Sequence, residues 1–587
     1  MTTDYKDYTQ RLFQQYSRFM NELITSGGTP ADSDSAGQPT PSGLTDARID
    51  TDKLIRHQFA YLGKQLELWQ SMGRAMHGGA SEPVVSEDKG DRRFGDEDWS
   101  TNPLFSFIKQ SYLLNSRLLT DMLDSVEFKD DSQSDKLKFL LRQYINAVSP
   151  SNTLLANPEV YRTALETNGE SVHKGLTNLF SDLQQSSRSA LKLTQTDESG
   201  FVVGETLATT PGSVVYQNEI MQLIQYAPTT KQVYATPLLI TPPYINKYYV
   251  MDLDEKKSLV RWLVGKGFTV FMISWVNPGA ELAHKSFSDY VTQGPVEALE
   301  VVRDITGEDK VSLVGYCVGG TISSLTAALL KAQGKDHLAS LTLLTTLLDF
   351  SNPGEVGHFL SESTWPRLKQ EVQNTGYMDG RSVALGFNLL RENQLFWPYV
   401  INNYLKGKTP QAFDILYWNS DNTHIPATNY IEYLENTYLH NRLIEPGAVE
   451  IDGTPIDVSS IDVPVYVLAT RADHIVLWEA AYQSMQALSS APIRFVLAES
   501  GHLAGVINPE KGGKYGHRTN PDTTGSAAAW FAAADEQTGS WWPDWFAWAQ
   551  QHFAPSSADM TSARQVGNTA DYPELEPAPG SYVRKRV

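Results

Sequence analysis

A chain of 587 residues, 41% of them apolar and 20% charged, is long enough for a large buried core with additions to it. Its net charge of -20 argues against nucleic-acid binding, which needs a basic surface to displace counterions from phosphates, so any anionic substrate must be held by a few local cations. The single cysteine excludes an intramolecular disulfide and a cysteine-based metal site, as is usual in a reducing cytosol.

Residues 1 to about 190 predict a helical N-terminal domain, because apolar residues recur there at spacings of three and four. Amphipathic helices are expected over Tyr5–Ile24, Asp52–Met76 and Pro103–Val126. Residues 26–45 and 77–98 are rich in Gly and polar or charged residues, which predicts mobile linkers. The sequence has no signal-peptide pattern and no apolar run of membrane-spanning length, so we expect a cytoplasmic protein without a transmembrane segment.

Short apolar runs alternate with helical stretches beyond residue 209, which predicts an α/β fold with a mostly parallel central sheet. The expected strands are Thr236–Thr241, Thr269–Trp275, Lys310–Gly315, Leu341–Thr345, Val463–Thr470 and Ile493–Ala498. We therefore expect residues 191–349 and 461–587 to form the two parts of this core.

The alternation stops between the fourth and fifth of these strands. Residues 350–460 are long, aromatic and mostly helical in pattern, which predicts a cap inserted over the carboxyl ends of the strands. The tail after Ala554 is rich in Pro, Ser and Glu, and we expect it to be loosely held. The tryptophan-rich stretch 541–548 either packs a last helix on the sheet, which we favour, or touches polymer or membrane.

A nucleophile motif follows the third expected strand. Gly315-Tyr316-Cys317-Val318-Gly319 has the G-x-S-x-G pattern of the α/β-hydrolase nucleophile elbow, with Cys in place of Ser. Small neighbours allow the tight strand-to-helix turn, and the helix N-terminus that follows favours a thiolate. A lone cysteine is more often an inert buried thiol, but the strand before it and the helix after it favour a nucleophile.

Two further candidates follow directly on later strands, in the order in which this fold places its acid and its base. Asp473 follows the strand that ends at Thr470, and His502 follows the strand that ends at Ala498. We expect His502 to act as the general base and Asp473 to hold its tautomer and stabilise the imidazolium. The alternatives are a helix N-cap for Asp473, a surface loop position for His502, and His474 as a rival base.

The oxyanion hole of this fold needs two backbone N–H groups. Val318, directly after the nucleophile, should supply one. The loop Pro242-Pro243-Tyr244-Ile245 should supply the other, and because proline has no N–H the donor must be Tyr244 or Ile245, of which we choose Ile245. The loop could also be a rigid turn without a catalytic part.

These segments together resemble polyhydroxyalkanoate synthases, and the resemblance covers roughly residues 90–585. The matching stretches are Pro242–Tyr249, Gly315–Gly320, Thr345–Phe350, Leu389–Asn393, Tyr417–Asp421, Asp473–Ile475 and Gly501–Pro509, with Asp91–Phe94 and Trp99 before them.

The resemblance implies a Cys317–His502–Asp473 triad that polymerises (R)-3-hydroxyacyl-CoA, such as 3-hydroxybutyryl-CoA, through a cysteine thioester. The products are a polyester and free CoA, so CoA is a leaving group and we expect no cofactor and no metal. The single-subunit, short-chain-length type implies a homodimer in the cytoplasm, at the surface of polymer granules and possibly with granule-coat proteins.

Substrate contacts are expected outside the triad. Arg391 is the candidate for the CoA phosphates, since its guanidinium matches phosphate geometry, although a salt bridge within the cap is an equal alternative. Tyr244, Asn246 and His474 are the other expected substrate-binding residues.

Two other functions compete with this interpretation. A cysteine-type hydrolase of the dienelactone-hydrolase kind shares the G-x-C-x-G motif, but it would be far shorter. A non-catalytic, granule-associated protein on an inactive hydrolase fold would explain the helical front, but not an intact triad.

Overall fold

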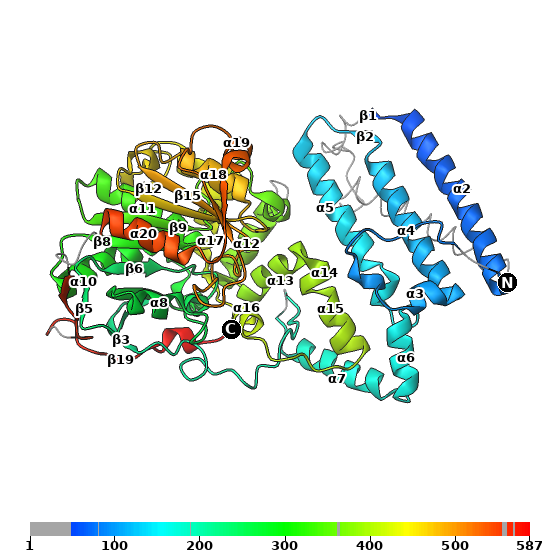
Figure 1. Cartoon of the computed structure of the whole chain (residues 1–587), viewed down its shortest axis with the longest axis horizontal. Coiled ribbons are helices and arrows are strands. Elements are labelled where there is room, and N and C mark those ends of the chain that lie inside the picture. Colours follow the sequence, from blue (N-terminus) through cyan, green and yellow to red (C-terminus); the bar gives the residue numbers. More distant parts are fainter. Residues whose placement is uncertain (1–47, 80–81, 188–189, 361–363, 555–559, 568–569) are drawn as a thin grey trace, which may run out of the picture. The chain divides into compact units, whose positions relative to one another are not determined.

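The computed structural model describes residues 48–587, except 80–81, 188–189, 361–363, 555–559 and 568–569 (Figure 1). The chain divides into two compact units, Met1–Asn168 and Gly169–Val587. The expected helix Tyr5–Ile24 and the linker 26–45 lie outside the described residues. Within the described ranges, no helix is both long and apolar enough to cross a membrane.

The described part of the first unit is built from helices, as the sequence predicts. The helices are α2 (Thr51–Met76), α3 (Asp98–Thr101), α4 (Pro103–Leu123), α5 (Asp131–Ala147) and α6 (Pro158–Glu166). Helix α2 packs on α4, and α4 packs on α5. Side-chain caps fix two of the starts, because Asp50 accepts a hydrogen bond from the Lys53 amide and Asn102 accepts one from Leu104.

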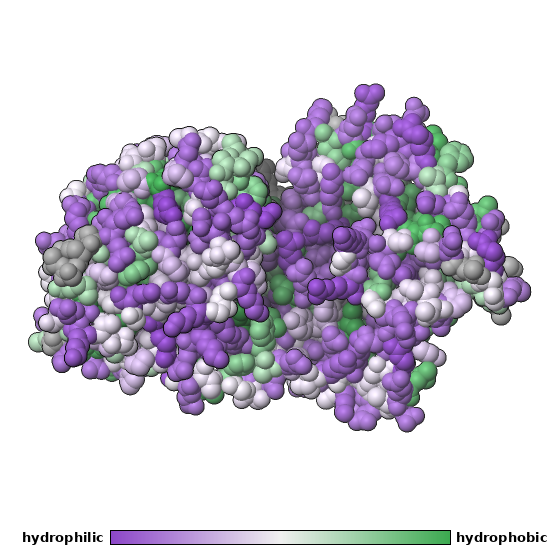
Figure 2. Space-filling view, in the orientation of Figure 1, coloured by the Kyte–Doolittle hydropathy of each residue, from purple (hydrophilic) through white to green (hydrophobic). Residues whose placement is uncertain are grey.

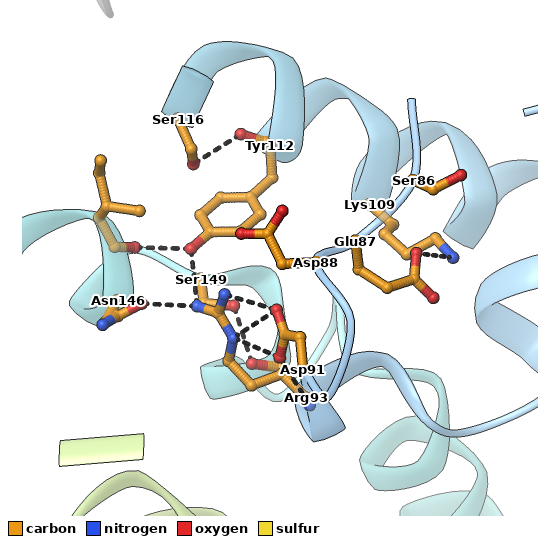
Figure 3. A network of polar contacts seen from close by, with 12 residues as sticks. Ser86, Glu87, Asp88, Asp91, Arg93, Lys109, Tyr112, Ser116, Asn146 and Ser149 are labelled. Carbon is orange, nitrogen blue, oxygen red and sulfur yellow. Dashed lines mark hydrogen bonds and ion pairs between the residues drawn. The ribbon is translucent and has the colours of Figure 1, made fainter. Parts of the chain in front are cut away.

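The prediction of a mobile linker over residues 77–98 is wrong for the part that the structure describes. Val85 and Phe94 are buried in one core with Leu68 of α2 and Tyr112 of α4. Figure 3 shows how Arg93 closes this arrangement: it pairs with Asp91 and donates hydrogen bonds to Tyr112 and Asn146. Composition hid the apolar anchors, which stand singly among Gly and charged residues, and each such anchor contributes about 1.5–3 kcal/mol when fully buried.

The second unit contains one large sheet, with its strands in the order β17-β16-β15-β14-β9-β8-β6-β7-β4-β3-β19 in the described chain. The central strands run parallel, as predicted, and match the expected runs to within a few residues. They are β7 (Val270–Trp275), β6 (Leu238–Thr241), β8 (Val311–Tyr316), β9 (Leu338–Leu344), β14 (Val465–Thr470) and β15 (Ile493–Ala498).

The central strands read as continuous apolar runs because both faces of the sheet are covered. On β6, Leu239 faces one core cluster, whereas Leu238 and Ile240 face the other. The first cluster contains α10 (Glu297–Thr306), α11 (Val318–Ala332), α18 (Trp478–Gln486) and α19 (Ala527–Ala533). The second contains α8 (Leu259–Gly265) and α20 (Trp542–His552).

The antiparallel strands at both edges were not predicted. On one side β4 (Met221–Tyr226) and β3 (Gly212–Gln217) continue the sheet beyond β7, and β19 (Glu576–Pro577) pairs with β3. On the other side β16 (His517–Thr519) and β17 (Asp535–Gln537) continue it beyond β15. These strands are short or mixed in polarity, so they lack the apolar runs that identified the centre.

The segment between β9 and β14 is mainly helical, as expected for a cap. Its helices include α12 (Trp365–Thr375), α13 (Gly380–Leu390), α14 (Glu392–Leu395), α15 (Trp397–Tyr399), α16 (Asp414–Ser420) and α17 (Ala427–Leu434), with the π-helices η7 (Val400–Leu405) and η8 (Glu435–Leu439).

Helix α7 (Glu170–Gln184) belongs with this cap and not with the N-terminal helices. Asp182 accepts a hydrogen bond from the Tyr404 hydroxyl at 2.6 Å, and Asn178 donates one to the backbone of Asn403 at 3.0 Å. These contacts place the boundary between the units at Asn168, earlier than the residue 190 drawn from the sequence.

The expectation of a loosely held tail is also wrong for its described residues. Strand β18 (Met560–Ser562) pairs with β5 (Gln232–Tyr234), and Arg564 bonds to Glu308 and to the backbone of Tyr234. The tryptophan-rich stretch packs α20 on the sheet, as favoured, with Trp541, Trp542, Trp545 and Trp548 all buried. Pairing of backbone groups, which composition does not report, holds this tail.

Candidate active site

Cys317 lies at a strained turn between β8 and α11. Its φ of +54° and ψ of -125° belong to a region that side chains other than glycine rarely adopt, and such strain concentrates at functional sites. A side chain at Gly319 would collide with the carbonyl oxygens of Thr241 and Pro242, so glycine is required where α11 meets the loop after β6. The turn therefore presents the sulfur at the carboxyl end of the sheet, beside that loop.

His502 and Asp473 form a buried pair behind the sulfur. The Nδ1 atom of His502 lies 2.7 Å from Oδ2 of Asp473, and both side chains are buried. Asp473 also accepts hydrogen bonds from Thr470 and from the backbone amides of Ile475 and Val476. A carboxylate with this many donors is fixed in place, so it holds the imidazole with Nε2 free for Cys317.

The electrostatics of this pair favour a charged imidazole. Burial lowers the pKa of His502, but the charges of Asp473 and Cys317 and the hydrogen bonds to both raise it to about 10. Burial likewise raises the pKa of Asp473, but His502 and two backbone amides bring it below its usual value. An imidazolium beside Cys317 stabilises the thiolate, which is the nucleophilic form of cysteine.

The expected oxyanion loop lies against the nucleophile turn. Trp275 donates a hydrogen bond from Nε1 to the carbonyl of Pro242 at 2.9 Å, which holds the loop. Tyr244 is buried in the core, and Ile245 is half-buried against the same core cluster. Val318 begins α11 directly after Cys317, and the loop that carries Ile245 approaches this helix at Gly319.

Comparison with known proteins identifies the family. A family model described as the N-terminus of poly-beta-hydroxybutyrate polymerase (PhaC) matches residues 90–263, and an alpha/beta hydrolase fold model matches residues 240–509. The poly(3-hydroxyalkanoate) polymerase subunit PhaC of Cupriavidus necator is 43% identical over 94% of this chain and 92% of its own length. The chain belongs to the poly(3-hydroxyalkanoate) polymerase family. The poly(3-hydroxyalkanoate) polymerase of Methylorubrum extorquens is 42% identical over 92% of this chain and 88% of its own length.

Membership of the polymerase family confirms the resemblance seen in the sequence and the α/β-hydrolase fold. The chain is an enzyme of this family, so we set aside the non-catalytic granule protein. A short hydrolase of the dienelactone-hydrolase kind does not fit a chain that aligns with polymerases over almost their whole length.

Arg391 lies close enough to His474 for its charge to act on the imidazole. Burial, then the positive charge of Arg391, lower the pKa of His474 to about 4, and His502 acts in the same direction. His474 is therefore neutral at neutral pH, whereas His502 is charged. Arg391 is exposed between α13 and α14, where its guanidinium can reach a ligand in solvent.

Asn246 lies where the loop after β6 meets the cap. Its backbone forms a bridge with Asn422 of the cap, and the residue lines a small cavity with Lys247 and Thr423. In the described contacts nothing links this side chain with Cys317. The backbone of Asn246 therefore joins the loop to the cap, and its contact with substrate stays a prediction.

Two features around the loop and the nucleophile were missed in the sequence. Lys247 and Asp421 form a buried ion pair at 2.7 Å, and this pair ties the loop to the cap. Asp421 also accepts a hydrogen bond from the Tyr249 hydroxyl. Tyr433, at the end of α17, and Tyr438, in η8, lie close enough to Cys317 for its charge to act on them. Burial raises the pKa of each tyrosine most, and the charge of Cys317 raises it further. The aromatic spacing over residues 430–438 was the available signal, but it does not tell which side chains face the sulfur.

Proposed function

We propose that this enzyme polymerises (R)-3-hydroxyacyl groups, such as 3-hydroxybutyryl, from CoA thioesters through a thioester on Cys317. The observation that carries the proposal is the strained Cys317 turn, backed by the buried His502–Asp473 pair and covered by the aromatic cap. No metal or cofactor is required, because the substrate thioester already supplies an activated acyl group.

Acylation exchanges one thioester for another. The Cys317 thiolate attacks the acyl carbon, and the amides of Val318 and Ile245 donate to the oxygen as it becomes negative. The bond to the CoA sulfur breaks, and CoA leaves with the proton that His502 donates. The acyl group stays activated on the enzyme, which an oxygen ester would not achieve as well.

Elongation joins this acyl group to a second one. The 3-hydroxyl of the incoming group loses its proton to His502 and attacks the thioester carbon, which forms an ester bond and returns Cys317 to a thiolate. Asp473 stabilises the imidazolium that results. Water would compete for the same thioester, so the aromatic residues of the cap, Tyr433 and Tyr438 among them, serve to keep the site dry.

Arg391 is proposed to bind the CoA phosphates. Its side chain is exposed, lies close enough to lower the pKa of His474, and forms no ion pair with a carboxylate in the described part of the chain. Arg391→Ala should raise the KM for 3-hydroxybutyryl-CoA about tenfold or more while changing kcat little, because a charge-assisted phosphate contact is lost. Steady-state release of CoA measures both constants.

The matched control is Arg367→Ala, which removes an exposed guanidinium from α12 of the same cap. This variant should retain the wild-type KM. A KM for Arg391→Ala that also equals the wild-type value would remove Arg391 from the CoA site.

We propose that the N-terminal unit binds the surface of the polymer granule. We also propose that the enzyme is a homodimer. An apolar stripe runs along α2 with alternating spacings of three and four, and Figure 2 shows hydrophobic surface on this unit. The stripe consists of Ile55, Phe59, Leu62, Leu66, Trp69 and Met76, each more than 40% exposed. Soluble monomers rarely expose such a contiguous patch without a function.

Adding positive charge to this stripe should weaken granule binding without changing the rate of CoA release. The double variant Phe59→Lys, Leu66→Lys should bind polyester granules much less in a sedimentation assay and release CoA at the wild-type rate, because Cys317 lies in the other unit. The control Gln58→Lys, Gln70→Lys adds the same charges at exposed polar positions of α2 and should sediment normally. Equal sedimentation of both double variants would refute the role of the stripe.

A further inference from the structure

A buried phenol beside the nucleophile has no partner of its own. Tyr244 is only 2% exposed, and its hydroxyl oxygen is buried without a hydrogen-bond partner among the described residues. Leaving a polar group unsatisfied in a core destabilises a fold, whereas phenylalanine would fill the same space without that cost. The hydroxyl therefore has a use that the protein alone does not reveal.

The neighbours of Tyr244 fix where its hydroxyl lies. The ring is held by Tyr290 at 4.9 Å, Tyr433 at 6.3 Å and Trp275 at 6.4 Å between ring centroids. Burial raises the pKa of Tyr244 most, and the charges of Tyr290 and then Cys317 raise it further. The hydroxyl is therefore protonated at neutral pH, can donate a hydrogen bond, and lies close enough to the sulfur for that charge to act on it. The loop that carries Tyr244 is the one pressed against the nucleophile turn.

Tyr244 stands apart from the other tyrosines around the sulfur. The charge of Cys317 also acts on Tyr316, Tyr433 and Tyr438. The hydroxyl of Tyr316 bonds to the carbonyl of His502, and in the described chain neither Tyr433 nor Tyr438 has a buried hydroxyl without a partner. Among these four tyrosines, Tyr244 alone has a buried hydroxyl without a hydrogen-bond partner in the described chain, so a ligand could supply one.

The substrate offers one polar group that the rest of the site does not serve. In the proposed site, backbone amides donate hydrogen bonds to the acyl oxygen. The other polar group near the reacting carbon is the 3-hydroxyl, two carbons away, and no partner has been assigned to it. A phenol both donates and accepts hydrogen bonds, as an alcohol does. We infer that the Tyr244 hydroxyl binds the 3-hydroxyl of the acyl group on Cys317 and thereby selects 3-hydroxyacyl thioesters over unsubstituted ones. This inference rests on the proposed function.

The test compares two substrates that differ only in that hydroxyl. The full-length wild type is mixed with 3-hydroxybutyryl-CoA or with butyryl-CoA, and chromatography follows the CoA released in the first turnover. The wild type should be acylated faster by 3-hydroxybutyryl-CoA, because a site with an unpaired polar group rejects the analogue that cannot pair with it. Tyr244→Phe should lower this preference about tenfold or more by slowing the hydroxylated substrate alone.

Thermal unfolding is the second readout on the same variant. Tyr244→Phe should melt at the wild-type temperature or above it, since the unsatisfied hydroxyl is gone. The matched control is Tyr226→Phe on β4, an equally buried phenol that the charge of Cys317 does not reach, and it should keep the wild-type preference.

Each outcome decides a different point. An unchanged preference in Tyr244→Phe, or an equal slowing of both substrates, would overturn the inference, the latter because it would place the phenol on the acyl oxygen. A wild type without preference would overturn it without any variant. A wild type that releases CoA from neither substrate would instead refute the proposed function, and the inference would fall with it.

Discussion

Replacing Cys317 with alanine should abolish CoA release and leave the fold intact. The sulfur is the one protein atom that forms a covalent bond to the acyl group in the proposed reaction, and removing such a nucleophile costs on the order of 10⁴-fold or more in rate. The change removes one atom from a half-buried side chain, so the melting temperature should stay close to that of the wild type. Release of CoA from 3-hydroxybutyryl-CoA, followed together with turbidity from the polymer, measures the loss.

Serine at the same position refines this test. Cys317→Ser should also be severely impaired, because a hydroxyl is harder to ionise and an oxygen ester is less activated toward the next hydroxyl than a thioester. The strained backbone at residue 317 does not depend on the sulfur, so both variants should fold. Activity of the alanine variant at the wild-type level would end the assignment of Cys317 as the nucleophile.

The central sheet and the order of its functional residues could be predicted because each depends on local sequence. A parallel strand buried on both faces must be an apolar run, and a nucleophile turn must carry small residues next to Cys317. Asp473 and His502 each follow such a run directly, and because β14 and β15 are parallel, both residues lie at the carboxyl ends of the strands. None of these predictions requires knowledge of contacts between residues far apart in the sequence.

The features that were missed depend on contacts far apart in the chain. The tail was expected to be loose because it is rich in Pro, Ser and Glu, yet β19 is held by backbone pairing with β3. Lys247 and Asp421 look like surface charges until the cap brings them together and buries both. The backbone bridge between Asn246 and Asn422 likewise joins residues that are far apart in the sequence.

His502→Gln should slow acylation by about 10²–10⁴-fold, the usual contribution of a general acid–base group. The same change should slow alkylation of Cys317 by iodoacetamide at neutral pH, because the imidazolium that stabilises the thiolate is gone. His474→Gln is the matched control: the pKa of His474 is lowered to about 4, so at neutral pH it is uncharged and lends no charge to the thiolate. Its effect on both rates should be much smaller.

The pH dependence of alkylation separates this charge effect from a distorted site. The pKa of His502 is raised to about 10, so in the wild type the imidazolium persists through neutral pH and is lost only as the pH rises through that value. The deficit of His502→Gln should therefore be largest near neutral pH and should shrink as the pH approaches about 10, where the wild type loses the same charge. A deficit that is constant with pH would mean that the substitution disturbs the geometry around Cys317. A larger loss in His474→Gln than in His502→Gln would show that His474 is the base.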